Sequence, residues 1–505
     1  MAPGEMVFLI GYFLILLGLS FYGTHRYHMA VLYYRHKAEV PVPATPFAAA
    51  RKPHVTIQLP VFNERYVVRR LIDYVCQIRY PAELLEIQVL DDSTDDTVDI
   101  SRAAVEEWRA RGVDIVLIHR TDRTGFKAGA LQNGMQRAKG ELIAVFDADF
   151  TPGPDFLERT VPFFGDEGIG MVQARWTHIN RRYSLLTRAQ SILLDGHFVI
   201  EHTARNRSGR FFNFNGTAGI WRRQTIGEAG GWQHDTLTED LDLSYRAQLA
   251  GWRFVYLNDL LSPAELPVEM NAFKTQQHRW AKGSIQVALK LLPRILRSDL
   301  SIKVKFEAFV HLTNNVAYVL MVLMSLMLPF SLHIRLDQGW YQAVFLDLPF
   351  FIGATVSVCA FYMVSQSEAG VRSRAERLAY LPIVLALGIG LAVNNAKATL
   401  EALFGHQSPF VRTPKLAVDE QSGRAVRPRK VYMSGRNMLA WFELGLGAVY
   451  TYTVIYCIQT RLWMALPFML IFQFGFLYIG LMSLFQWSSL RRPRVAAVKP
   501  DPDPA

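Results

Sequence analysis

Long apolar runs with few charges divide the chain into a middle segment of mixed composition and membrane-type segments on either side. One run lies near the N-terminus and the other five lie beyond residue 300; they cover residues 6–22, 309–332, 343–364, 378–396, 438–458 and 462–485. Most of them approach the roughly 20 residues that a helix needs to cross a bilayer. We therefore expect an integral membrane protein with one water-soluble domain between the first two runs.

The first run predicts an uncleaved anchor, because no basic segment precedes it and no Ala-x-Ala site directly follows it; a cleavable signal peptide is the alternative. Basic residues follow this run and recur in the tail, which predicts that the soluble segment and the C-terminus face the cytoplasm. The five later runs must then cross an even number of times. The run containing Pro382, Asn394 and Asn395 is the weakest, so we expect it to be interfacial or re-entrant.

These patterns predict four parts. They are an N-terminal transmembrane helix (1–35), a cytoplasmic domain ending in an interfacial helix at 270–300 (36–301), a membrane channel region (302–490) and a basic, Pro-rich tail (491–505). Within the membrane region, 378–404 is the segment expected not to cross, and 405–436 is a basic loop.

The net charge of +10 fits basic loops at an anionic membrane surface. No zinc-finger or other nucleic-acid motif accompanies it, so no nucleic-acid partner is expected. The three cysteines have no metal-like spacing, and two of them lie in membrane runs, which excludes a disulfide framework.

Inside the soluble segment, strand-like runs alternate with helix-like ones. Strands are predicted at 55–59, 86–90, 113–118 and 142–146, with helices ending near 79 and covering 97–111 and 128–139. This alternation predicts a doubly wound α/β domain with a mainly parallel sheet. Ligands of such sheets bind beyond the carboxyl ends of the strands, where this chain places polar clusters. The clusters are Asn63 with Glu64, Asp91 with Asp92, and Asp147 with Asp149.

Asp147 and Asp149 are candidates for a metal site. Clustered carboxylates repel one another unless a cation lies among them, and oxygen ligands favour Mg²⁺ or Mn²⁺ whose coordination is completed by substrate phosphates. The alternative is a helix-capping aspartate, which Pro152 and Pro154 just downstream would suit. An Asp-x-Asp triplet does not by itself decide between them.

Four motifs together resemble one family. "DDSTDDT" from Asp91, "DAD" from Asp147, "TED" from Thr238 and "QQHRW" from Gln276 occur in the order typical of processive, inverting family 2 glycosyltransferases of the cellulose synthase superfamily. "GFKAGAL", "FNGTAG" and "QQHRWAKG" are similar to the cellulose-synthase-like A and C group and its bacterial relatives. The resemblance implies a GT-A-type domain and polymerisation of a β-linked glucan, mannan or glucomannan, with β-1,4 as the expected linkage and translocation of the product as a further expectation.

The resemblance also implies roles for individual residues. The group expected to bind the donor nucleotide is Asn63, Glu64, Asp91, Asp92, Lys127 and Asp147. The group expected to hold Mg²⁺ or Mn²⁺ is Asp147 and Asp149. The donor- and acceptor-binding group is Gln276, Arg279, Trp280, Phe214, Asn215, Gly216, Thr217 and Glu239. A loop similar to the gating loop of bacterial cellulose synthase contributes Phe410, Arg412, Thr413 and Lys415, with Pro414 departing from the usual residue.

Asp240 in "TED" is expected to be the general base, since inverting transfer needs a carboxylate to take the proton of the attacking hydroxyl. Glu239 and Asp242 are its competitors. Leu241, Tyr245 and Leu249 follow at helical spacing, so Asp240 is also predicted to lie in the first turn of a helix.

Two alternatives stay open. A monoglycosyl lipid synthase would share the four motifs, and a non-enzymatic membrane protein would only bind nucleotide; the intact "TED" and "QQHRW" argue against the second. The expected partners are a nucleotide sugar, either UDP-glucose or GDP-mannose, a growing β-glycan or glycolipid acceptor, and the lipid bilayer. The expected location is a bacterial inner or plasma membrane, or the Golgi in a eukaryote. The sequence does not indicate whether accessory subunits bind.

Overall fold

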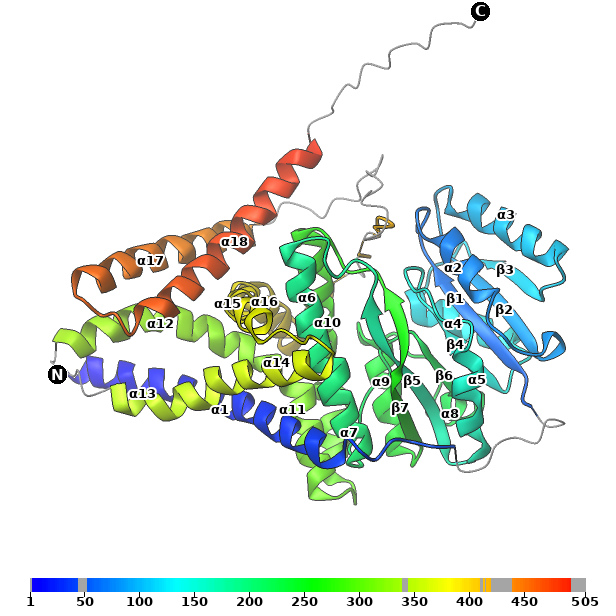
Figure 1. Ribbon diagram of the computed structural model, residues 1–505, viewed down its shortest axis with the longest axis horizontal. Coiled ribbons are helices and arrows are strands. Elements are labelled where there is room, and N and C mark those ends of the chain that lie inside the picture. Colours follow the sequence, from blue (N-terminus) through cyan, green and yellow to red (C-terminus); the bar gives the residue numbers. More distant parts are fainter. Residues whose placement is uncertain are drawn as a thin grey trace, which may run out of the picture.

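A seven-stranded sheet forms the core of the middle segment (Figure 1). The computed structural model describes residues 2–43, 52–337, 344–408, 412–413, 415–418 and 438–491. The strand order is β3-β2-β1-β4-β6-β5-β7. The strands are β1 (Val55–Val61), β2 (Leu85–Asp91), β3 (Ile115–His119), β4 (Leu142–Val145), β5 (Ile169–His178), β6 (Gly219–Arg222) and β7 (Arg253–Ala264).

The four predicted strands are confirmed, and they pair in parallel as expected. β1 lies between β2 and β4, with Val61 opposite Asp91 and Val55 opposite Leu142. β6 is antiparallel to both β4 and β5, whereas β5 and β7 are parallel. The domain is therefore of the predicted mainly parallel, doubly wound type.

Alternate residues of the strands pack into two separate cores, one on each face of the sheet. In β4, Leu142 and Ala144 face one core, whereas Ile143 and Val145 face the other. Burial of both faces explains why this strand reads as a continuous apolar run. The covering helices are α2 (Val68–Val75), η2 (Ala82–Leu84), α3 (Thr97–Ala110), α4 (Phe126–Arg137), α5 (Phe156–Thr160), η3 (Val161–Gly165), α8 (Arg223–Glu228) and α9 (Glu239–Leu249).

A second group of helices lies between the sheet and the long apolar helices (Figure 1). It consists of α6 (Leu185–Asp195), the π-helix η4 (Gly196–His202), α7 (Thr203–Arg207), α10 (Met270–Arg297) and α11 (Ile302–Thr313). The helix predicted at 270–300 is thus one continuous helix of 28 residues.

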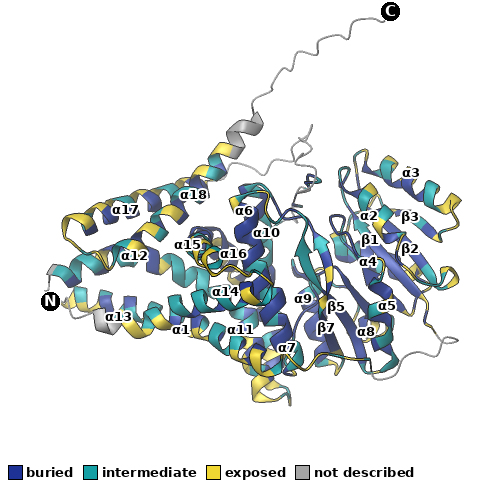
Figure 2. Ribbon diagram, viewed as in Figure 1, coloured by how far each residue is buried: buried dark blue, intermediate teal, exposed yellow. Residues whose placement is uncertain are grey.

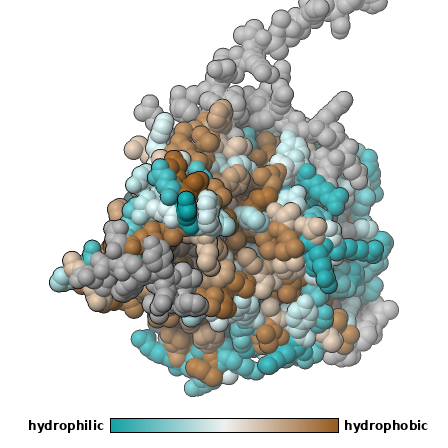
Figure 3. All heavy atoms as spheres, turned by 60° about the vertical axis from the view of Figure 1, so that its left-hand side comes forward, coloured by the Kyte–Doolittle hydropathy of each residue, from teal (hydrophilic) through white to brown (hydrophobic). Residues whose placement is uncertain are grey.

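The remaining helices form the apolar part of the molecule. They are α1 (Pro3–His36), α12 (Val316–Asp337), α13 (Val344–Phe351), η6 (Ile352–Val356), α14 (Ser357–Glu368), α15 (Arg374–Gly390), α16 (Ala392–Leu403), α17 (Leu439–Gln459) and α18 (Leu466–Arg491). Large apolar side chains such as Phe330 and Trp441 are exposed here, and Figures 2 and 3 show exposed and apolar surface over this part. Such a surface suits contact with lipid.

Six stretches of the described chain are long and apolar enough to cross a membrane, and they coincide with the six predicted runs. One of them, 374–403, is interrupted at Leu391 between α15 and α16. Half of its most apolar window is buried inside the protein, a larger share than in the other five. The assignment of 378–404 as an interfacial or re-entrant segment stays a prediction.

Candidate active site

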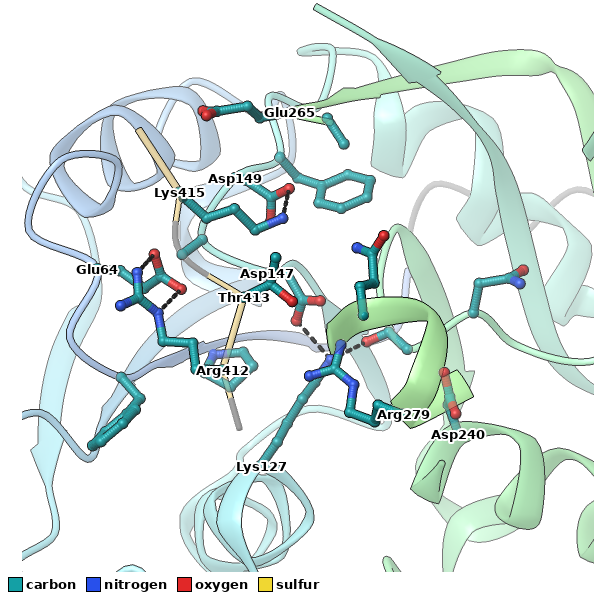
Figure 4. Close-up of a pocket in the computed structure, with 18 of the residues that line it drawn as sticks. Glu64, Lys127, Asp147, Asp149, Asp240, Glu265, Arg279, Arg412, Thr413 and Lys415 are labelled. Atoms are coloured by element: carbon teal, nitrogen blue, oxygen red, sulfur yellow. Dashed lines mark hydrogen bonds and ion pairs between the residues drawn. The ribbon is translucent and has the colours of Figure 1, made fainter. Parts of the chain in front are cut away.

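A cavity opens beyond the carboxyl ends of β1 and β4, where the sequence predicts a ligand (Figure 4). Its walls come from the loops after these strands, from the N-terminus of α9 and from α10. Residues 412, 413 and 415 close part of it. The predicted site residues in its lining are Glu64, Asp92, Lys127, Asp147, Asp149, Asn215, Gly216, Glu239, Asp240, Gln276, Arg279, Trp280, Arg412, Thr413 and Lys415.

Lys127 ties together two segments of this lining. Its Nζ donates to Asp147 Oδ1 at 2.6 Å and to the carbonyl oxygen of Gly216 at 2.8 Å. Burial alone would lower the pKa of Lys127, but the nearby carboxylates of Asp147 and Glu239 hold it above its ordinary value. A permanently charged ammonium therefore lies beside the Asp-x-Asp motif, where it could also meet a phosphate.

Two cations of the 412–418 segment pair with acidic residues of the cavity. Arg412 donates from Nε and Nη2 to the two carboxylate oxygens of Glu64 at 2.8 and 2.6 Å, and Lys415 Nζ lies 2.6 Å from Asp149 Oδ2. Burial raises the pKa of Glu64 to about 7, although Arg412 opposes this shift. Phe410 lies outside the described residues.

Asp240 lies in the first turn of α9, as predicted, and its Oδ1 accepts a hydrogen bond from its neighbour Leu241 N at 2.8 Å. Burial and the carboxylate of Glu239 raise the pKa of Asp240 to about 7, against the opposing charges of Lys127 and Arg279. A carboxylate with this pKa suits proton transfer near neutral pH.

Gly216 packs directly against Asp240. Its φ of 80° is in the left-handed region, and a Cβ added there would lie 2.9 Å from Asp240 Oδ2. Only glycine therefore lets the "FNGTAG" segment approach the carboxylate this closely. Asp242, the second competitor for the base, is fully buried and pairs with Arg246 Nε at 2.8 Å, so it does not line the cavity.

Helix α10 supplies the opposite wall. Gln276, Arg279 and Trp280 stand at positions i, i+3 and i+4, which puts them on one helical face, and all three line the cavity. Gly283, one turn further on, allows α10 to press against the start of α9, since a Cβ there would lie 2.5 Å from Thr238 Cγ2.

Four predicted residues do not line the cavity, because their side chains serve the surrounding structure. The Phe214 ring is fully buried against Trp221 in a core beside the sheet. The remaining three stabilise loops through these contacts: Thr217 Oγ1 accepts from Asp147 N at 2.8 Å, Asp91 Oδ1 accepts from Ser93 N at 2.7 Å, and Asn63 Oδ1 accepts from Thr94 N at 2.9 Å.

Other cavity residues were not predicted. Arg123 lies over the ring of Phe62, 3.3 Å from its centroid, and Trp176, His178 and Glu265 also line the walls. In addition, Arg120 forms a two-point ion pair with Asp92 at 2.8 and 2.6 Å. The basic run before Lys127, "HRTDRTGFK", is a signal that could have indicated the two arginines.

The sheet is mainly parallel and has a cavity at its carboxyl edge. This cavity holds an Asp-x-Asp motif and a separate carboxylate on a helix. The arrangement is that of a GT-A-type glycosyltransferase domain. Residues 53–283 match the family described as glycosyltransferase like family 2. This match agrees with the motif resemblance to family 2 glycosyltransferases.

Several known proteins resemble the chain. Glucomannan 4-beta-mannosyltransferase 1 of Oryza sativa subsp. japonica is 45% identical over 268 residues, which are 52% of this chain and 51% of the relative. Glucomannan 4-beta-mannosyltransferase 2 of Arabidopsis thaliana is 44% identical over 272 residues, 53% of this chain and 50% of the relative. The chain thus spans about half the length of the curated relatives it matches.

Among solved structures, a mannosyltransferase from Pyrobaculum calidifontis in complex with GDP-Man and Mn²⁺ shares the fold. Its TM-score is 0.50 at 20% sequence identity, over 78% of this chain and 99% of that chain.

Proposed function

We propose that this protein is a membrane-embedded inverting glycosyltransferase that transfers mannose from GDP-mannose to a growing β-1,4-linked mannan or glucomannan. The observation that carries the proposal is one cavity that brings together Asp147, Lys127, Asp240 and Arg279. The identity of 44–45% to glucomannan 4-beta-mannosyltransferases supports the choice of sugar and linkage.

Asp240 is the proposed general base. Its carboxylate takes the proton of an acceptor hydroxyl while the hydroxyl oxygen bonds to C1 of the donor sugar, the bond from C1 to the phosphate oxygen breaks, and GDP leaves. The raised pKa supports this role, because a base works best when its pKa lies near the working pH. Lys127 and Arg279 supply positive charge for the phosphates.

Asp147 and Asp149 are the residues proposed to hold Mg²⁺ or Mn²⁺. No group of three or more His, Cys, Asp and Glu side chains suited to a metal occurs within the described ranges, so substrate phosphates and water would complete the coordination. Each carboxylate pairs with a lysine ammonium group at 2.6 Å, so both carboxylates attract positive charge here, and a divalent ion would replace these two contacts. A bound divalent ion would neutralise charge on the leaving diphosphate.

The apolar helices support a location in a lipid bilayer, with the family 2 domain facing the cytoplasm as the charge distribution predicts. Trp280 and Gln276 face the cavity from α10, whose other contacts reach the membrane-type helices α16 and α17. An acceptor chain held against α10 would therefore lie close to the membrane helices.

The test is transfer by the purified full chain in nanodiscs, with Mn²⁺ or Mg²⁺ and either GDP-[¹⁴C]mannose or UDP-[¹⁴C]glucose. We expect label from GDP-mannose in a polymer that an endo-β-1,4-mannanase digests, and no such product from Asp240→Asn. Label that enters only an organic-solvent extract would instead indicate transfer to lipid. Incorporation from UDP-glucose alone would refute the proposed donor.

A further inference from the structure

The π-helix η4 places two histidines side by side behind the cavity. His197 and His202 are five residues apart, and their ring centroids lie 4.2 Å from each other. In an α-helix, residues at i and i+5 point in different directions, whereas the wider π-helical turn brings them to the same side. Single π-turns are frequent at functional sites.

Both histidines bind the same carboxamide. His202 Nε2 lies 2.6 Å from Asn215 Oδ1, and His197 Nε2 lies 3.2 Å from Asn215 Nδ2. The backbone N–H of Asn215 is fixed as well, by donating to Gln173 Oε1 at 3.2 Å. An asparagine side chain has two N–H donors and two lone pairs. One donor and one lone pair of Asn215 therefore stay available to a ligand.

Glu201 determines which way this amide points. Its carboxylate lies 3.1 Å from His197 Nδ1, so that nitrogen donates to it, and Nε2 of the neutral ring is then an acceptor. Asn215 then has to present Nδ2 to His197 and Oδ1 to His202. Burial favours a protonated Glu201, but Arg205 and His197 hold the pKa of that carboxyl well below its ordinary value.

The cavity side of this arrangement adjoins the proposed base. Asn215 lines the cavity and directly precedes Gly216, the residue that packs against Asp240. The same π-helix supports a second lining residue, since Phe198 stacks on Trp176 with centroids 4.9 Å apart. An amide with free hydrogen-bonding capacity and an aromatic ring are the groups with which proteins bind sugar hydroxyls and sugar faces.

We infer that the π-helix is an acceptor-positioning element: His197 and His202 orient Asn215 so that its free donor and lone pair bind a hydroxyl of the terminal acceptor sugar beside Asp240. This inference rests on the proposed function. Asn215 is the residue in contact with the sugar, and the two histidines are positioning residues that act through it.

The anchoring of the π-helix explains how this orientation is kept. Arg205, just after η4, donates to Glu307 of α11 at 2.9 Å, and Glu307 also contacts His25 of α1 at 2.9 Å. Both side chains of the Arg205–Glu307 pair are at most 3% exposed. The histidine pair is thus fixed to the long N-terminal helix as well as to the sheet domain.

The experiment compares His202→Phe with His202→Gln in transfer from GDP-mannose to β-1,4-mannotetraose. Phenylalanine keeps the ring that packs against Phe198, Phe212 and Tyr256 but loses the donor, whereas glutamine loses the ring and keeps a donor. We expect His202→Phe to raise the acceptor KM by about 3- to 10-fold, the range set by one lost hydrogen bond, and His202→Gln to raise it less. The KM for GDP-mannose and the rate of donor hydrolysis without acceptor should not change.

A double-mutant cycle completes the test. In an Asn215→Ala background, His202→Phe should have no further effect on the acceptor KM, because the histidine acts through that amide. His119→Phe, at an exposed histidine on the far edge of the sheet, is the matched control and should behave as wild type. Full additivity, or a smaller effect of phenylalanine than of glutamine, would show a packing role and overturn the inference. Wild-type protein without any transfer from GDP-mannose would instead refute the proposed function.

Discussion

Replacing Asp240 with asparagine separates a carboxylate that accepts a proton from a side chain that only binds. Asparagine keeps the size of the side chain and can still accept from Leu241 N, the 2.8 Å hydrogen bond that orients Oδ1. What it removes is basicity. If Asp240 accepts the acceptor proton in the transition state, turnover should fall while the affinity for GDP-mannose stays close to that of the wild type.

The expected loss is large. A positioned general base contributes about 10²- to 10⁴-fold to the rate, so Asp240→Asn should lower kcat by that factor. The assay is initial-rate incorporation of labelled mannose at saturating donor, with GDP-mannose affinity measured separately by competition.

The pH dependence gives an independent measurement. Because the base works only when ionised and its pKa is raised to about 7, kcat/KM should rise with pH up to about 7 and level off above it. At pH 6, about one tenth of the carboxylates are ionised, so the rate should be about tenfold below the plateau. Asp240→Asn should lose this limb of the profile.

The stability of the folded protein should fall as the pH rises, in the opposite direction to kcat/KM. The folded state raises the pKa of Asp240 from 3.8 to about 7, so it binds the proton more tightly than the unfolded chain does, and folding loses stability as the pH rises through this window. At pH 8 the full penalty is present, and neutral asparagine removes it. Asp240→Asn should therefore have a higher melting temperature at pH 8 than the wild type.

Two neighbours serve as controls. Glu239→Gln alters a carboxylate that lines the same cavity, and Asp242→Asn alters one that is buried against Arg246. Asp242→Asn should lower stability but keep the pH profile. If Asp240→Asn keeps turnover within about threefold of wild type while Glu239→Gln loses it, Asp240 is not the general base and Glu239 takes that role.

Four other results are expected. Lys127→Met should raise the KM for GDP-mannose by about 10- to 100-fold in initial-rate assays, since a charged hydrogen-bond donor is lost; an unchanged KM would contradict the phosphate role. Asp149→Asn should abolish Mn²⁺-dependent GDP-mannose binding in calorimetry, and binding that persists in EDTA would refute the metal site. Glu443→Gln should lower stability by about 3–5 kcal/mol, because it leaves the buried Lys274 unpaired, and Lys274→Met with Glu443→Leu should restore much of it in thermal unfolding. A cysteine at exposed Arg109, in a background without the three native cysteines, should resist an impermeant maleimide in intact cells; ready labelling would reverse the topology.

The first half of the domain could be predicted because its strands and helices alternate with clear periodicity. β1 to β4 coincide with apolar runs, and the polar residues after them lie at one edge of the sheet. The second half carries weaker signals. The antiparallel direction of β6, Gly219–Arg222, follows from its pairing with β4 and β5 and not from its own sequence.

Part of the candidate site could likewise be predicted from the sequence, and part could not. Short motifs indicated Asp147, Asp240 and Arg279, which do line the cavity. The contacts of Arg412 with Glu64 join residues 348 positions apart, and no local pattern contains that information. Phe214 was assigned to the site from its motif, but its ring lies in a core beside the sheet, a difference that depends on which side of the "FNFNG" segment meets the sheet.

Helix α10 has a consequence for building chimeric enzymes. Arg279 and Gly283, one turn apart on the same face, contact the cavity and the start of α9, whereas Lys274 contacts α17 from a different side of the helix. Each added or deleted residue would turn everything beyond it by about 100°. The match to glycosyltransferase like family 2 ends at residue 283, in the middle of this helix. If a catalytic domain from another protein were joined at that boundary, the turns of α10 would have to continue in register across the junction. A functional exchange should therefore transfer α10 together with the membrane helices that pack against it.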